Sequence, residues 1–249
     1  MIRDTALFFA HEARNTLRNP IWPLFGITQP VLYLLLFAPL FAGGSFQGEM
    51  GTALSTFAPG MLVITALFGS MGVAYGTIFE LRNGVLERIA VSPVWRPSIV
   101  LGRMLRDVAV LMVQSLAVML VAMAMGLRVG PLGVLLMLAL LAVTGLFASG
   151  VAYGLALSLR DENAMGQIMQ FFALPLMLLS GALLPMAFGP DWLETISWFT
   201  PFYHPVEAGR ALFAGDFGDV SVPLAFGIML GLAALTVTWS VRSLRRLAG

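Results

Sequence analysis

The side chains of this sequence that are best suited to polar chemistry are concentrated in residues 80–106. This segment holds five of the fourteen basic residues of the chain, and all fourteen are arginines. An arginine at the centre of a bilayer costs about 2.5–3.5 kcal/mol on insertion scales, so we expect the segment to lie in water between apolar stretches. Guanidinium groups in such a loop form ion pairs and hydrogen bonds with a partner protein, and they supply neither a nucleophile nor a general base.

Catalytic and metal-binding motifs are missing from the sequence. It contains no cysteine, which excludes disulfides, thiol catalysis and cysteine-ligated metals. The two histidines, His11 and His204, stand alone and far apart. There is no His-Glu-x-x-His or Gly-x-Ser-x-Gly motif, and without lysine there is no Gly-x-x-x-x-Gly-Lys-Ser/Thr phosphate loop. We therefore predict that the chain is not an enzyme, has no catalytic residue or metal site, and binds no cofactor itself.

The composition indicates an integral membrane protein. Hydrophobic residues make up 59% of the 249 residues and charged residues 11%, whereas soluble domains contain about 25% charged residues. Several apolar stretches reach about 20 residues, the length of a helix that crosses a bilayer. We expect an all-α integral membrane fold with one domain, residues 1–249, in contact with the lipid bilayer. The net charge of +1 gives no reason to expect nucleic-acid binding.

Six apolar segments are predicted to be transmembrane helices, at residues 21–42, 55–79, 104–126, 132–159, 164–184 and 221–242. With six spans, both termini lie on one side, and twelve of the fourteen arginines lie on that side too. Arg128 and Arg210 remain on the other side. The positive-inside rule therefore predicts cytoplasmic termini, in a multi-pass protein of the bacterial cytoplasmic (inner) membrane.

Two segments outside the spans are predicted to be helical. Residues 1–20 are expected to form an amphipathic interfacial helix with an apolar stripe of Ile2, Ala6, Phe9, Ala13 and Leu17. The charged residues of this helix, among them Arg3, Arg14 and Arg18, are expected to point elsewhere. Residues 185–220 are expected to form two short helices on the extracellular side before the last span. The first has Asp191 as its N-cap, and the second begins near His204-Pro205.

Residues 80–103 are predicted to be a cytoplasmic loop that contains a short helix. Gly84 permits a sharp turn after the second span, and Ser92-Pro93 ends the short helix. Its face with Leu86 and Ile89 is apolar, and Glu87 and Arg88 lie on another face. Such a helix suits a groove on a partner protein, although a solvated loop that only fixes the topology is the alternative. Glu80 is expected to pair with Arg82 or with Arg103.

Two motifs carry a resemblance to a known family. The run Glu80-x-x-x-Gly84-x-Leu86-Glu87-Arg88-Ile89-x-x-Ser92-Pro93 resembles the first cytoplasmic loop of ABC-2 type transporter permeases, and in particular of the daunorubicin-resistance type of drug-export permease. The run Leu179-Ser180-Gly181-Ala182-Leu183-Leu184-Pro185, followed by Pro190-x-Trp192-Leu193, Pro201 and Arg210, resembles the C-terminal signature of the same family. Together with the six spans, the resemblance covers essentially the whole chain.

The resemblance implies the partners of the chain. Two permease copies would pair, as a homodimer, and each would sit on a separate ATP-binding cassette subunit that binds ATP and Mg²⁺. The coupling contact with that subunit would use the residues of the first motif, namely Glu80, Arg82, Gly84, Leu86, Glu87, Arg88, Ile89, Ser92 and Pro93. The interfacial helix with Arg3, Phe9, Arg14 and Arg18 would pack alongside.

The cargo is predicted to be a hydrophobic or amphiphilic compound, because the spans are kinked, apolar and almost free of central charge. Candidate residues of the translocation path are Met165, Met169, Gln170, Phe172, Trp192 and Phe202, for which core or lipid-facing packing is the alternative. Polysaccharide or lipid-linked glycan is the alternative cargo, and an ion-coupled secondary transporter is a distant alternative. Three Gly-x-x-x-Gly pairs (Gly72 and Gly76, Gly150 and Gly154, Gly227 and Gly231) are expected to allow close helix crossings within one subunit.

Overall fold

The computed structural model describes residues 2–18, 21–43, 50–84 and 96–245, and the regular elements in these ranges are helices. They are α1 (Ile2–Arg18), α2 (Ile21–Gly43), α3 (Met50–Arg82), α5 (Arg96–Ala124), α6 (Pro131–Leu159), α7 (Glu162–Leu179), the 3₁₀ turn η1 (Met186–Phe188), α8 (Asp191–Ser197), α9 (Tyr203–Ala214) and α10 (Ser221–Arg245). The prediction of an all-α fold is confirmed for the described residues.

Each of the six predicted spans coincides with a helix. Four helices in the described ranges are long and apolar enough to cross a membrane, namely α3, α5, α6 and α10. In α2, the apolar stretch Gly26–Leu40 is shorter than the length taken for a membrane span, and α7 is 18 residues long. The predicted count of six crossings therefore stays a prediction, whereas the membrane-spanning character of the fold follows from the four long helices.

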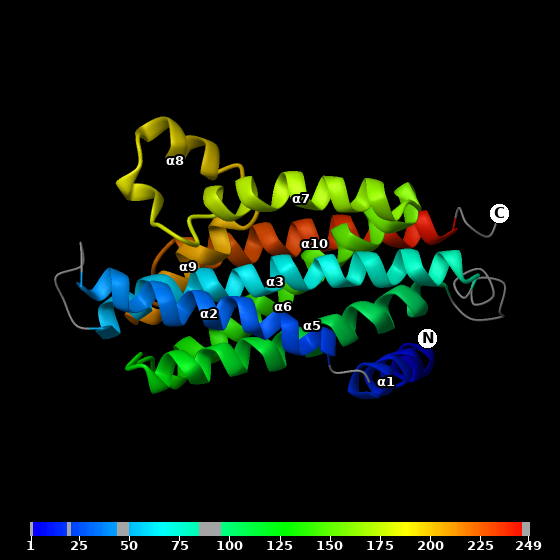
Figure 1. Cartoon of the computed structure of the whole chain (residues 1–249), viewed down its shortest axis with the longest axis horizontal. Coiled ribbons are helices and arrows are strands. Elements are labelled where there is room, and N and C mark those ends of the chain that lie inside the picture. Colours follow the sequence, from blue (N-terminus) through cyan, green and yellow to red (C-terminus); the bar gives the residue numbers. More distant parts are fainter. Residues whose placement is uncertain (1, 19–20, 44–49, 85–95, 246–249) are drawn as a thin grey trace.

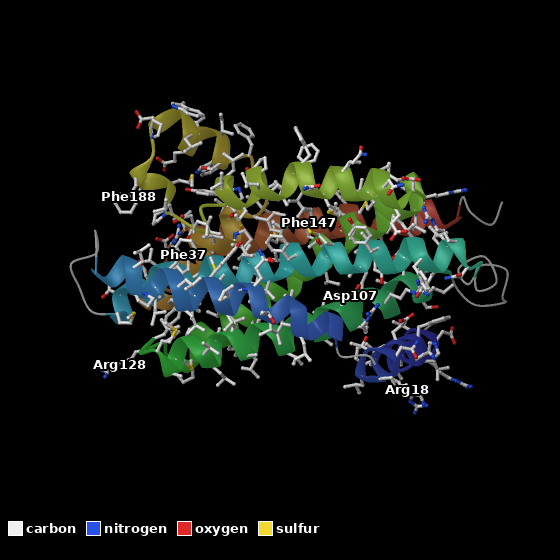
Figure 2. The ribbon with its side chains drawn as sticks, viewed as in Figure 1. Arg18, Phe37, Asp107, Arg128, Phe147 and Phe188 are labelled. Carbon is white, nitrogen blue, oxygen red and sulfur yellow. The ribbon has the colours of Figure 1, made fainter. Side chains whose placement is uncertain are left out.

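The long helices lie side by side along the longest axis of the molecule, and successive ones run in opposite directions (Figure 1). The helix α1 and the last turn of α10 lie at one end of this bundle, which we name the terminal end. The helices α8 and α9 lie at the opposite end (Figure 1). Arg18 and Arg128 mark these two ends (Figure 2). The basic residues of α1 and the first turns of α5 are thus at one end, as the arginine distribution predicts.

The centre of the bundle is built from close-packed apolar side chains of the long helices. Leu34 of α2, Leu62 of α3, Leu141 of α6 and Met229 of α10 are buried in one hydrophobic cluster. Glycine permits close packing of α6 against α10. A Cβ atom at Gly150 would lie 2.5 Å from Thr236 Oγ1, and Ser240 Oγ donates a hydrogen bond of 2.6 Å to the Gly150 carbonyl.

The three predicted glycine pairs behave differently. Gly150 and Gly154 support close packing within the subunit, since the ring of Trp239 occupies the space where a Cβ of Gly154 would stand. A Cβ at Gly72, Gly76, Gly227 or Gly231 would meet no atom within 4 Å in the described part of the chain. For these two pairs, the expectation of a close crossing within the subunit is wrong, because their glycines face away from neighbouring helices.

The short helices at the opposite end begin slightly earlier than predicted. The helix α8 begins at Asp191, and Pro190 is its N-cap, with a carbonyl that accepts a bond of 2.8 Å from the Leu193 amide. The prediction that Asp191 is the N-cap is therefore wrong, since its side chain makes no capping bond. The helix α9 begins at Tyr203, so Pro205 occupies its first turn, where a missing N–H costs no helical bond.

Candidate functional site

The predicted coupling segment is framed by two helix ends. Glu80, Arg82 and Gly84 are described, whereas Leu86, Glu87, Arg88, Ile89, Ser92 and Pro93 lie outside the described residues. The helix α3 ends at Arg82, and Gly84 has a φ of 66°, a left-handed conformation that glycine adopts without strain. The chain thus turns sharply where the sequence predicts a turn, and it re-enters a helix at Arg96.

Buried ion pairs tie these two helix ends together. Glu80 of α3 pairs with Arg103 of α5, the second of the two partners that the sequence left open. Arg103 Nε also lies 3.3 Å from Glu12 Oε1 of α1, and the Arg103 side chain is only 5% exposed. One guanidinium therefore joins three helices that meet at the terminal end.

A second arginine extends this network by one helix turn. Arg106 Nε lies 3.1 Å from Asp107 Oδ1, and Arg106 Nη2 lies 3.8 Å from Glu12 Oε2. Arg106 also donates a 3.3 Å hydrogen bond to Thr16 Oγ1 of α1. Tyr153 of α6 lies beside Arg106 and Asp107. We name Glu12, Glu80, Arg103, Arg106, Asp107 and Tyr153 the ion cluster.

The ion cluster is suited to mechanical linkage. It contains three carboxylates and two guanidiniums, and each of these groups has an oppositely charged partner within 4 Å. Removing one partner of a buried ion pair costs about 3–5 kcal/mol because the other charge is left without compensation. A displacement of the start of α5 relative to α1 or to the end of α3 would therefore have to break these ion pairs.

The contacts of α1 with α5 fix the rotation of α1 about its own axis. Glu12 and the half-buried Phe8 face α5, and a Cβ at Gly102 of α5 would lie 2.6 Å from the Phe8 Cβ atom. Leu17 is 81% exposed and Ala6 is exposed, although Phe9 is half-buried. Phe8 and Glu12 thus form the face of α1 that packs on α5, and the orientation of the predicted apolar stripe towards a membrane interface stays a prediction.

The exposed end of α3 makes a further contact at the terminal end. Arg82 Nη1 lies 3.0 Å from Glu162 Oε2 and Arg82 Nη2 lies 4.0 Å from Asp161 Oδ2, and all three side chains are about half exposed. Asp161 also accepts a 2.8 Å bond from the Ala164 amide as the N-cap of α7. Exposed pairs of this kind contribute about 0–1 kcal/mol, so this contact is weak beside the ion cluster.

A groove of about 500 Å³ opens between α2, α3 and α7. It is lined by Tyr33, Phe68, Met71, Tyr75, Gly166, Met169, Gln170, Ala173, Leu174 and Met177. Met169 and Gln170 are two of the six path residues named from the sequence. Tyr33 and Tyr75 were missed, although a hydroxyl group inside an apolar span is a signal that the sequence offers.

The other four path candidates lie elsewhere. Met165 is fully buried against Ala74, Ile78 and Ala152, and it therefore packs in the core. Phe172 is half exposed and stacks edge-on with Phe171 outside the groove lining, with ring centroids 5.1 Å apart. Trp192 is exposed on α8, and Phe202 is buried against Phe147 at the opposite end. Met169 packs against the cluster that contains Met165, but Met165, Phe172, Trp192 and Phe202 are not part of the groove lining.

A largely enclosed arginine, whose side chain is 13% exposed, holds the opposite end of the bundle together. Arg210 of α9 pairs with Glu207, donates from Nε to the Thr56 carbonyl of α3 at 3.0 Å, and also donates to the Gly181 carbonyl. A Cβ at Gly60 would lie 2.6 Å from the Cα atom of Ala182, so the turn after α7 rests directly on α3. Arg210 therefore links α9, α3 and the turn that follows α7.

His204, beside this region, has a structural environment. Its Nε2 lies 3.0 Å from the Trp198 carbonyl, and the ring is buried between Trp198 and Tyr203. Burial lowers the pKa of His204, which favours the neutral ring. In the part of the chain that the structure describes, no group of three or more His, Asp or Glu side chains is arranged to hold a metal ion.

The similarity to known proteins extends over the whole helical bundle. A protein-family model described as "ABC-2 type transporter" matches residues 4–214. The transport permease ycf38 of Cyanophora paradoxa is 31% identical over 203 residues, which cover 79% of this chain and 69% of that protein. The transport permease ycf38 of Pyropia yezoensis is 26% identical over 246 residues, which cover 93% of this chain and 82% of that protein.

Proposed function

Because this chain belongs to the ABC-2 type transporter family, we propose that it is the membrane-spanning permease subunit of an exporter driven by a separate ATPase subunit. The chain is a transport permease of the membrane, and its sequence contains no phosphate loop. Two copies pair, each carries one ATP-binding subunit with its ATP and Mg²⁺, and both termini face the cytoplasm of a bacterium.

The ion cluster is the observation that carries this proposal. It joins the end of α3 and the start of α5, the two helix ends on either side of the predicted coupling segment. A push on that segment by the ATPase subunit is carried through Arg103 and Arg106 to α1 and, through Tyr153, to α6. Movement of the partner thereby becomes movement of the bundle.

The groove between α2, α3 and α7 is the candidate path for the cargo. Its volume of about 500 Å³ is within the range of about 300–1,000 Å³ that is typical of sites for small organic ligands. Its lining is mostly apolar, with three flexible methionines and a few polar groups from Tyr33, Tyr75 and Gln170. This chemistry favours a hydrophobic or amphiphilic compound, such as a drug-like or lipid-like molecule.

Glycan export is the second candidate function. The observation that favours it is the exposure of Trp192, Trp198 and Phe199 in and beside α8, at the opposite end of the bundle. Exposed aromatic rings can stack on sugars, although they also suit the interface of a membrane. An amphiphilic cargo agrees better with the apolar groove.

The proposal is tested by producing the chain with the ATP-binding protein encoded next to its gene. We expect the two proteins to purify together in mild detergent as a particle of two permeases and two ATPase subunits. Candidate cargoes should stimulate its ATPase activity, and Met169→Trp, which fills the groove, should remove that stimulation. Phe172→Trp, on the same helix but outside the groove, is the matched control. A chain that never captures an ATPase subunit would refute the proposal.

A further inference from the structure

The charges of α1 are sorted between its two faces. Arg3, Arg14 and Arg18 are all exposed, together with Leu7 at 60% and Leu17 at 81%. We name these five residues the outer face of α1. Of the two acidic residues in α1, Glu12 is turned inward to Arg103 and Arg106, and Asp4 is half-buried. The outer face therefore presents three positive charges beside two large apolar side chains.

No other described part of the chain covers the outer face. The helix α1 packs against α5 at the periphery of the bundle, and Arg18 points away from the other helices (Figures 1 and 2). Within the described ranges, no ion pair within 4 Å compensates Arg3, Arg14 or Arg18. A basic face that remains open in this way attracts acidic surfaces outside the chain.

The mixture of arginine and leucine identifies the kind of surface. In an interfacial helix, leucine enters the boundary of the acyl chains, while the arginine guanidinium extends along its methylene stem to the headgroup phosphates. Four spans of this chain qualify for the same bilayer, so its surface lies close to the ends of the bundle. Three uncompensated positive charges favour anionic headgroups over zwitterionic ones.

We propose that the outer face of α1 binds anionic phospholipid headgroups. The buried pairs of Glu12 fix the rotation of α1, so this binding surface is held in place by the ion cluster. The inference goes beyond the transport function proposed above, because it concerns the lipid around the protein and requires no particular cargo.

The experiment uses the full chain with its ATPase subunit, reconstituted in lipid nanodiscs. The sequence has no cysteine, so Leu17→Cys creates a single site for a fluorescent donor beside the arginines. The acceptor is a dye on the acyl chain of either phosphatidylglycerol or phosphatidylcholine at trace amounts. We expect stronger energy transfer to phosphatidylglycerol, and we expect this preference to fall about fivefold for each arginine replaced by glutamine.

The matched control is Arg128→Gln, at the opposite end of the bundle, which should leave the preference unchanged (Figure 2). Raising the salt concentration should weaken the preference in the parent protein, a measurement that needs no further variant. Equal transfer to both lipids would overturn the proposal, as would a preference that persists in the triple Arg3→Gln, Arg14→Gln, Arg18→Gln protein. Absence of transfer to both lipids in this complex, with transfer present when the chain is reconstituted without the ATPase subunit, would show that a protein covers the outer face, and this result would also overturn the proposal.

Discussion

Replacing Arg103 by glutamine should weaken the junction of α1, α3 and α5 more than any exposed substitution. In the parent protein, Arg103 is 5% exposed and serves both Glu12 and Glu80. Arg103→Gln leaves these two carboxylates facing a neutral amide, with Arg106 still 3.8 Å from Glu12. Breaking a buried ion pair costs about 3–5 kcal/mol. At about 2–4 °C per kcal/mol for chains of this size, the expected loss in Tm is about 6–20 °C.

The assay is thermal unfolding of the purified protein in one detergent, with Arg82→Gln as the matched control. Arg82 forms only exposed pairs, so its loss should cost about 0–1 kcal/mol. Glu80→Gln alone should be milder than Arg103→Gln, because Arg103 keeps Glu12 as its partner. The double variant Glu80→Gln, Arg103→Gln should lose less stability than the sum of the losses in the two single variants, with an interaction energy of about 0.5–3 kcal/mol.

The same variants separate a structural role from a coupling role. In the complex with the ATPase subunit, Glu80→Gln should lower the amount of cargo exported per ATP hydrolysed, because the end of α3 is released from α5. If Arg103→Gln lowered Tm no more than Arg82→Gln did, the assignment of the ion cluster as the junction would be refuted.

Three further predictions concern other parts of the bundle. Gly154→Val should destabilise the protein by about 1–3 kcal/mol, because its side chain would displace the Trp239 ring, whereas Gly227→Val should leave Tm nearly unchanged. Arg210→Gln should lower Tm and speed amide hydrogen exchange in the turn after α7, since the Thr56 and Gly181 carbonyls lose their donor. The stability that His204 provides should be complete above its ordinary pKa of 6.5 and should decrease as the pH falls below it, because burial lowers the pKa of the folded ring. The Tm difference between the parent and His204→Gln, measured from about pH 5 to pH 7.5, should therefore shrink towards low pH.

Helix positions were largely predictable from the sequence, because each long helix is also a continuous apolar run. The six predicted segments overlap six observed helices, and Gly84 ends α3 where a sharp turn was expected. The start of α8 was off by one residue, since Pro190 and Asp191 are both common at helix starts. Only the backbone geometry shows which of the two provides the cap.

The ion cluster was predictable only in part. Arg82 is near Glu80 in sequence and Arg103 is one loop away, so the sequence offered two possible partners for Glu80. The structure pairs Glu80 with Arg103. Glu12 could not be assigned, because its contacts depend on the rotation of α1 about its own axis. Helical periodicity predicted the apolar stripe of an interfacial helix, but it did not predict that Glu12 would face α5. The sequence contains no local signal that shows which residues of α1 face α5.

The helix α7 contacts the described part of the bundle mainly at its two ends. Its first turn contacts Arg82 through Glu162, and the turn that follows it rests on Gly60 of α3. Between these ends, Met165 alone of its described residues is buried. Moving α7 away from the bundle would therefore expose little apolar surface that is now buried within the chain. Under the proposed function, a cargo that entered the groove sideways from the lipid would therefore displace α7 at a low cost in buried apolar contacts.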